Sequence, residues 1–259
     1  MSEEPSNELR SLLAQANQAL KLAGESLNLA VEGMPLFPDF QSQYIRQQAL
    51  SVASVALDVH LLVDHERFQN VVGLCRIGFE SRISIYAAMR VPDFAAQKYL
   101  AGAKGHVEEL EELIRSGANS PSFQRELEHH RRLLEEMLRD MSGIQEKSWW
   151  KFQEVARAAG LMADYEAHYS MLSKATHNTP TGLAAKAAPQ IVARFVLQLL
   201  NDAIQACAAL VFFQMPNGKS PKPLTIHWKE MIPRIDSLQG EYGNLRSSLS
   251  QLFKEEFSE

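Results

Sequence analysis

The chain has 259 residues, of which 46% are apolar and 22% are charged, with 26 Lys and Arg against 31 Asp and Glu. A chain of this size and composition buries a large core, which excludes an intrinsically disordered protein. The formal net charge of −5 gives no overall positive field, so generic coating of DNA or RNA is disfavoured.

Cysteine usage and hydropathy predict the compartment. Cys75 and Cys207 lie among apolar residues far apart in the sequence, so we expect two buried free thiols in a reducing cytosol. The acidic N-terminal residues lack an apolar stretch, and we expect no signal peptide. The most apolar segment, 191–213, contains Arg194 and Asp202, so we expect a buried helix there and no membrane span. These features predict a cytoplasmic protein.

Proline placement divides the chain into long helices. No proline occurs at positions 39–91 or 122–179, and apolar residues recur in both intervals at spacings of three and four. The pattern predicts helices over 7–32, 40–63, 67–90, from Pro92 to Arg115, and over 121–141, 148–160, 162–178, 188–214 and 233–257. The helix over 67–90 is apolar on nearly every side, so it is expected at the centre.

Several residues mark where these helices begin and end. Pro92 pushes the preceding residue out of the helical region and ends one helix. Ser120 and Pro121 supply an N-cap and a first helical position for the next. Pro233 is expected at the start of the last helix, and 224–228 is expected to be a short extended segment, too small to build a sheet.

The predicted fold is all-α, a single domain over 1–259 formed by a bundle of eight or nine helices. Its core is expected over about 40–215, and the C-terminal amphipathic helix over about 233–257. Charges of both signs are dense between Lys104 and Asp140, which predicts a solvated helical hairpin over about 104–141 that projects from the body.

Two lines of polar residues at four-residue spacing are the main candidates for a functional site. Residues four apart lie on one face of a helix. The two lines consist of Arg76 and Glu80 on the helix over 67–90, and of Tyr169, Ser173 and His177 on the helix over 162–178. A buried arginine and carboxylate need further hydrogen bonds to offset their desolvation. We therefore expect the two lines to face each other.

Two interpretations of this network remain open. A polar network inside a bundle can serve only to fix helix register. In the functional interpretation, His177, Arg76 and Glu80 are catalytic, and Tyr169, Ser173 and Asn178 bind a ligand. The position of His177 at a helix C-terminus favours function slightly, because an adjoining loop exposes the imidazole and the helix dipole increases its proton affinity.

The segment Leu74–Glu80, followed by Tyr169–His177, resembles a bacterial family of uncharacterised all-helical proteins, a domain of unknown function. In that family an Arg-x-x-x-Glu helix precedes a helix that ends in Tyr, Ser and His. The resemblance covers about residues 40–215, and Cys75 stands where the family usually has leucine. It implies an all-helical fold and these polar positions, and it implies no established reaction.

The predicted hairpin contains two weaker motifs. Arg125 and His130 match the spacing of an arginine and a histidine in HEPN ribonucleases, helical proteins of toxin and defence systems. On so charged a helix, a solvated surface is the favoured interpretation. Glu126 and His129 match one Glu-x-x-His element of a di-iron bundle, but no second element occurs, so we expect no metal and no cofactor.

The leading functional prediction is a binding or regulatory module that acts through partner contacts and a small polar pocket. The terminal amphipathic helices either pack into the body or pair with a second copy or another protein. The alternative is a HEPN-like ribonuclease or another phosphoryl-processing enzyme, with His177 as general acid or base and Arg76 as the group that stabilises the anion.

Overall fold

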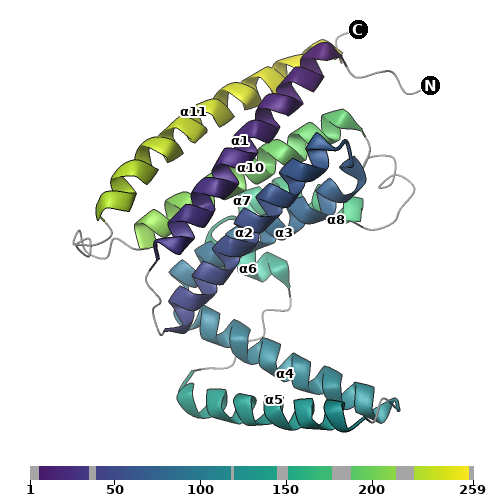
Figure 1. Ribbon diagram of the computed structural model, residues 1–259, viewed down its shortest axis with the longest axis vertical. Coiled ribbons are helices and arrows are strands. Elements are labelled where there is room, and N and C mark those ends of the chain that lie inside the picture. Colours follow the sequence, from purple (N-terminus) through teal and green to yellow (C-terminus); the bar gives the residue numbers. More distant parts are fainter. Residues whose placement is uncertain are drawn as a thin grey trace.

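The computed structural model describes residues 6–34, 39–117, 120–144, 151–176, 188–213 and 225–256. Every regular element in these ranges is helical, which confirms the predicted all-α fold. The bundle consists of α1 (Asn7–Glu32), α2 (Phe40–Asp64), α3 (Val71–Arg90), α10 (Pro189–Phe213) and α11 (Thr225–Glu256). The short elements on one side of α3 are α6 (Phe152–Ala159), α7 (Met162–Asp164), the π-helix η2 (Tyr165–Tyr169) and α8 (Ser170–Thr176). A hairpin of α4 (Phe94–Arg115) and α5 (Pro121–Asp140) projects from this body (Figure 1).

Side-chain caps explain why three of these helices begin where they do. The side chains of Ser6, Asp39 and Ser120 each accept a hydrogen bond from a backbone N–H in the first turn of α1, α2 and α5. Such a cap satisfies an amide that has no partner within the helix. The predicted starts of these three helices are confirmed.

The last helix begins earlier than predicted. Residues 225–228 are helical rather than extended, and Pro233 lies inside α11. A proline in a helix interior costs about 3 kcal/mol because it removes a hydrogen bond and crowds the preceding turn. The side chains of Met231, Ile235 and Leu238 around it are buried in the core, and this burial offsets the cost.

Helix α3 lies at the centre of the body, as predicted. It packs against α2, α6, α8 and α10, and the side chains of Phe79 and Ile83 are fully buried. Among the described residues, one helical segment, Pro189–Val211, is long and apolar enough to cross a membrane by length and composition alone. The bundle buries 72% of its most apolar window, which agrees with the buried helix predicted there.

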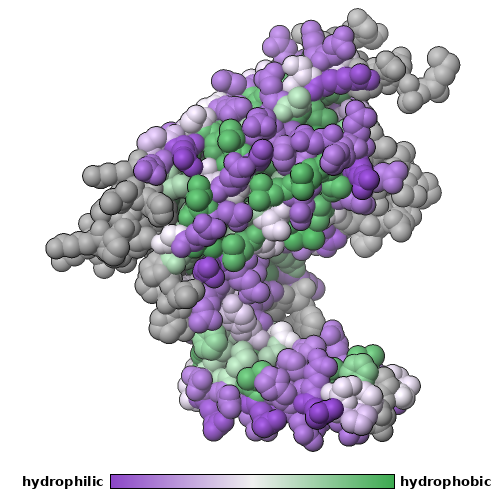
Figure 2. All heavy atoms as spheres, in the orientation of Figure 1, coloured by the Kyte–Doolittle hydropathy of each residue, from purple (hydrophilic) through white to green (hydrophobic). Residues whose placement is uncertain are grey.

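The two terminal helices pack into the body. Helix α1 lies against α2, α10 and α11, and Leu20 and Leu27 on its inner face are fully buried (Figure 1). Exposed leucines such as Leu22 and Leu61 remain on the outer surfaces of α1 and α2. Figure 2 shows apolar side chains gathered on this face of the body, whereas the hairpin is mostly hydrophilic. Pairing with a second copy stays a prediction.

The hairpin has a small core of its own. Val107 and Leu110 of α4 pack on Leu127 of α5, and Arg131 Nη2 lies 2.6 Å from Glu111 Oε1 across the two helices. Most other residues of α5 are exposed. The predicted projecting charged hairpin is therefore present, and its helices span 94–140 rather than 104–141.

Gly78 allows α3 to approach α10 closely. A Cβ atom at this position would overlap Leu199 Cδ1 of α10, whereas a Cβ at Gly73 on the same helix would meet nothing within 4 Å. We expect Gly78→Ala to lower the free energy of unfolding by about 1 kcal/mol, because overpacking outweighs the gain in helix propensity. Urea denaturation measures the change.

Gly73→Ala is the matched control, and it should raise the free energy of unfolding by about 0.5 to 1 kcal/mol through helix propensity alone. Equal stabilisation by both substitutions would contradict the close approach of α3 and α10 at Gly78.

Candidate functional site

The first predicted polar line meets the second at one residue. Arg76 Nε lies 2.8 Å from Glu80 Oε1, and Arg76 Nη2 donates a hydrogen bond of 2.9 Å to the hydroxyl of Tyr169. The expectation that the two lines face each other is confirmed for these three residues. Ser173 lies half-buried one turn further along α8. The predicted residues His177 and Asn178 lie outside the described residues.

This group lies at the surface, which corrects the expectation of a buried arginine and carboxylate. The side chains of Arg76 and Glu80 are 27% and 33% exposed. The guanidinium carbon of Arg76 lies 5.2 Å from the centroid of the Tyr169 ring, within reach of a cation–π contact. The catalytic and binding roles predicted for these side chains stay predictions.

Aromatic stacking holds Tyr169 in place. Its ring stacks on Tyr165, with centroids 4.6 Å apart, and on Phe152, with centroids 5.4 Å apart. Burial and the nearby Glu80 raise the pKa of Tyr169, although Arg76 opposes them. The hydroxyl therefore stays protonated at neutral pH and serves as a fixed hydrogen-bonding group.

The arginine that is truly buried is Arg82, which is 1% exposed. Its Nη2 donates to Asp164 Oδ2 at 2.8 Å, and its Nε lies 2.8 Å from Asp202 Oδ1. Asp202 is fully buried; its contact with Arg82 is an ion pair, and its Oδ1 atom accepts a hydrogen bond of 2.9 Å from Gln198 Nε2. We call Arg82, Asp164 and Asp202 the buried ion cluster; Arg82 and Asp202 are buried, whereas the side chain of Asp164 is 39% exposed. The cluster joins α3 to α7 and α10.

The charge of Asp202 is only partly compensated. Burial raises its pKa to about 6, although Arg82 and Gln198 act in the opposite direction. Its Oδ2 atom has no hydrogen-bond partner within the described part of the chain. An unsatisfied carboxylate oxygen in the core disfavours the charged form, so Asp202 takes up a proton at a mildly acidic pH.

Sequence reasoning missed the buried ion cluster because its members lie on different elements. The only signal was Asp202 itself, since a lone carboxylate in the apolar segment 191–213 requires a cation from another helix.

A π-helical turn directs both ends of one segment toward α3. The predicted helix over 162–178 is not a continuous α-helix, since residues 165–169 form η2. Hydrogen bonds between residues five apart place such residues nearly above one another, whereas an α-helix separates them by about 140°. Asp164 and Tyr169 are five apart, and they reach Arg82 and Arg76 on the same helix.

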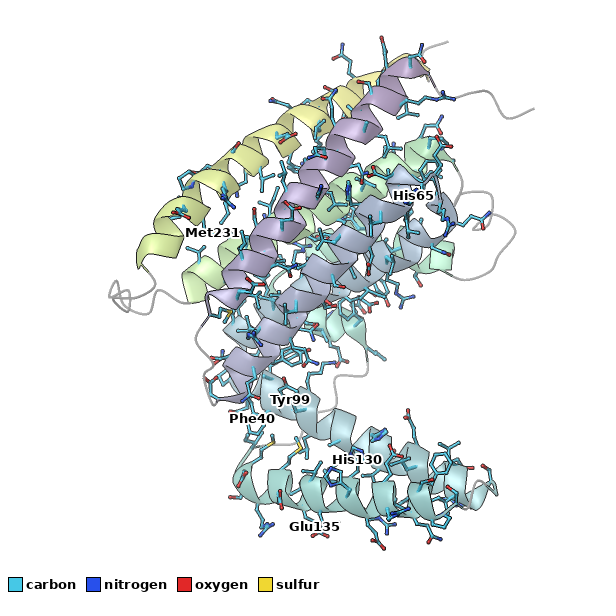
Figure 3. All side chains as sticks on the ribbon, viewed as in Figure 1. Phe40, His65, Tyr99, His130, Glu135 and Met231 are labelled. Atoms are coloured by element: carbon cyan, nitrogen blue, oxygen red, sulfur yellow. The ribbon has the colours of Figure 1, made fainter. Side chains whose placement is uncertain are left out.

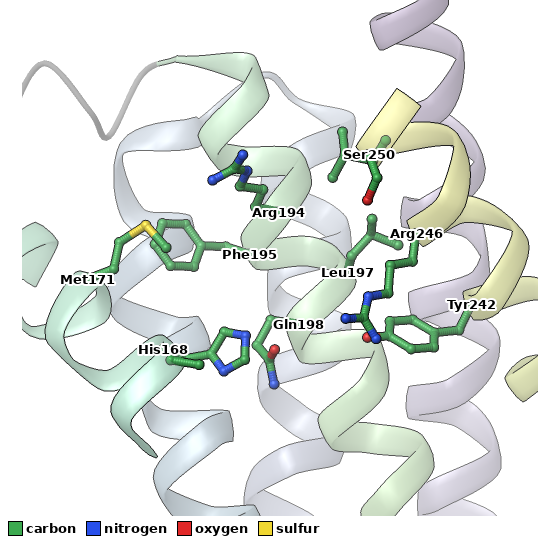
Figure 4. Close-up of a pocket in the computed structure, with 11 residues that line it drawn as sticks. His168, Met171, Arg194, Phe195, Leu197, Gln198, Tyr242, Arg246 and Ser250 are labelled. Carbon is green, nitrogen blue, oxygen red and sulfur yellow. The ribbon is translucent and has the colours of Figure 1, made fainter. Parts of the chain in front are cut away.

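A pocket of about 430 Å³ lies between the η2–α8 segment, α10 and α11 (Figure 4). Its lining consists of Ala167, His168, Met171, Arg194, Phe195, Leu197, Gln198, Tyr242, Arg246, Leu249 and Ser250. Figure 4 shows His168 beside Gln198, with Arg246 and Tyr242 reaching in from α11. Sequence reasoning did not find this pocket, because its walls come from three separate segments.

The pocket is connected to the buried ion cluster through α10. Arg194, Gln198 and Asp202 follow one another at four-residue spacing, which places them along one face of this helix. Gln198 lines the pocket and also donates to Asp202. The described lining contains two arginines and no carboxylate, a combination that suits an anion.

The hairpin motif does not bring its arginine and histidine together. Arg125 Nε donates to the carbonyl of Pro121 on its own helix, whereas the ring of His130 lies 4.3 Å from that of His106 on α4. In the described hairpin, no hydrogen bond or ring contact joins Arg125 to His130. The nuclease alternative therefore gains no support from this pair.

Replacing Arg82 with leucine tests the buried ion cluster. We expect Arg82→Leu to lower the free energy of unfolding near pH 7.5 by about 3 kcal/mol, since it strands a buried carboxylate. Loss of the guanidinium raises the pKa of Asp202 beyond about 6. A raised pKa contributes stability at low pH that is lost as the pH rises through it, so the defect should shrink near pH 5. Urea denaturation at both pH values measures this.

The double variant Arg82→Leu with Asp202→Leu is the control. It removes both charges, so it should regain part of the stability near pH 7.5 and lose the pH dependence of the single variant. An equal loss of stability by Arg82→Leu at both pH values would contradict the role assigned to Asp202.

Comparison with protein-family models matches residues 44–187, more than half of the chain, to a family described as a Family of unknown function (DUF5677). Searches of curated proteins and of solved structures found no match. The matched range includes Arg76, Arg82, Asp164 and Tyr169, whereas the pocket walls on α10 and α11 lie beyond it. The chain therefore belongs to the family of unknown function DUF5677.

Proposed function

We propose that this protein is a binding module that takes up a small organic anion, bearing a phosphate or carboxylate group, in the pocket between α8, α10 and α11. One observation carries the proposal: Arg194 and Arg246 come from two different helices to a pocket whose described lining has no acidic side chain. A binding or regulatory role in the cytoplasm, rather than catalysis, forms part of the proposal.

The size and walls of the pocket suit a small molecule. A volume of about 430 Å³ falls within the range of roughly 300 to 1,000 Å³ that is common for small-molecule sites. Phe195, Leu197 and Leu249 supply apolar surface beside the arginines. A ligand with an anionic group and an apolar portion would use both parts of the lining.

His168 supplies a hydrogen-bonding group in the pocket. Its Nδ1 lies 3.0 Å from the carbonyl oxygen of Asp164, and a carbonyl only accepts, so Nδ1 is the protonated nitrogen. In the neutral imidazole, Nε2 is then an acceptor for a hydroxyl or amide of the ligand. The same contact ties His168 to the residue that binds Arg82.

Isothermal titration with pyrophosphate and with citrate, at constant ionic strength, tests this proposal. We expect Arg246→Gln to weaken binding of the preferred probe by at least about tenfold, because a hydrogen bond to a charged group contributes about 1.5 to 3 kcal/mol. Arg194→Gln should have an effect of the same sign.

Arg234→Gln is the matched control, since Arg234 is exposed on α11 outside the pocket lining. It removes the same charge and should leave the affinity within about twofold, which is the effect expected of long-range charge alone. Equal losses in Arg234→Gln and Arg246→Gln would show nonspecific attraction, and failure of both probes to bind would refute an anion site.

A further inference from the structure

The projecting hairpin brings together three side chains that ligate metals. One donor atom each from His106, Glu126 and His130 lies within 4.8 Å of the other two. The rings of His106 and His130 are 4.3 Å apart and nearly perpendicular, and Figure 3 shows His130 between α4 and α5. We propose that these three residues form a binding site for Zn²⁺ or a similar divalent transition-metal ion.

The fold of the hairpin creates this arrangement. Glu126 and His130 are four residues apart, so they share one face of α5. His106 stands opposite them on α4, next to Val107 in the small core of the hairpin. Val107 packs on Leu127, the neighbour of Glu126, and this contact sets the separation of the two helices at the cluster.

The donor set determines the class of metal. Two imidazoles and one carboxylate suit zinc and related transition metals, whereas magnesium and calcium prefer oxygen donors. Zinc bonds of about 2.0 to 2.2 Å require the donor atoms to move closer than they now lie. Rotation of the side chains allows this, since His106 is 42% exposed and Glu126 is exposed.

Three protein ligands leave one tetrahedral position for water or for a ligand from outside the chain. The carboxylate of Glu109 lies 3.9 Å from Nδ1 of His106 and adds negative charge beside the cluster. The negative charge of Glu109 would therefore favour a bound cation. Because its ligands come from both helices, the ion would link α4 to α5.

This cluster differs from the metal motif considered in the sequence. The Glu-x-x-His pattern pairs Glu126 with His129, whereas the structure groups Glu126 with His130 and with a histidine of the neighbouring helix. The ring of His129 lies 5.4 Å from that of His130 but stands outside the cluster. His129 therefore serves as a control on the same helix.

The test is titration of the full chain, stripped with a chelator, with ZnCl₂ in a calorimeter. We expect one strong equivalent of Zn²⁺, and at least tenfold weaker binding in each of His106→Gln, Glu126→Gln and His130→Gln. His129→Gln should bind like the wild type, and so should Arg246→Gln, which separates this site from the proposed anion pocket. Backbone hydrogen exchange in α5 should slow on addition of Zn²⁺ in the wild type and not in His106→Gln.

Three results would overturn the proposal. They are the absence of a strong equivalent in the wild type, unchanged affinity in His106→Gln and Glu126→Gln, or an equal loss in His129→Gln. His130 is partly buried, so circular dichroism checks that its variant still folds. If His130→Gln does not fold, the zinc affinities of His106→Gln and Glu126→Gln test the proposal, because these two side chains are more exposed.

Discussion

The neutralisation of Arg82 is the interaction on which the rest of the structure depends. A guanidinium that is 1% exposed is tolerated only when carboxylates surround it, because removing one charge from water costs several kcal/mol. Asp202 on α10 and Asp164 on the short α7 form ion pairs with Arg82. These ion pairs help to hold the segment of short helical turns on α3, together with the apolar packing of Leu172, which is fully buried in the main core.

Two arginines of α3, Arg76 and Arg82, each bind one residue of that segment. Arg82, which is buried, binds Asp164 just before the π-helical turn, and Arg76 binds Tyr169, the last residue of the turn. Two residues that line the pocket also contact the buried ion cluster. Gln198 donates to Asp202, and Nδ1 of His168 lies against the backbone carbonyl of Asp164. A buried polar network of this kind can fix register and support a site together.

The sequence predicted the features that local physics decides. Ser6, Asp39 and Ser120 cap helices through neighbouring amides, so their starts could be read from nearby residues. The start of α11 could not, because burial of Met231 and Ile235 overrides the local preference of Pro233. Four-residue spacing predicted the pair of Arg76 and Glu80, because both residues lie on one helix. It could not predict the ion pairs of Arg82, because its partners lie on other elements. The pocket was equally hidden, since three segments distant in sequence form its walls.

The π-helical turn fits one more residue between two contacts than an α-helix would. Five residues of this turn cover nearly the same rotation as four residues of an α-helix, so Asp164 and Tyr169 both face α3 although they are five residues apart. An α-helix of unchanged length would turn Tyr169 away from Arg76 by about 100°. Deletion of one residue between 165 and 169, with a return to ordinary α-helix, would instead keep both contacts in place. Within this family, a gap of one residue over 165–169 is therefore compatible with the same pair of contacts to α3.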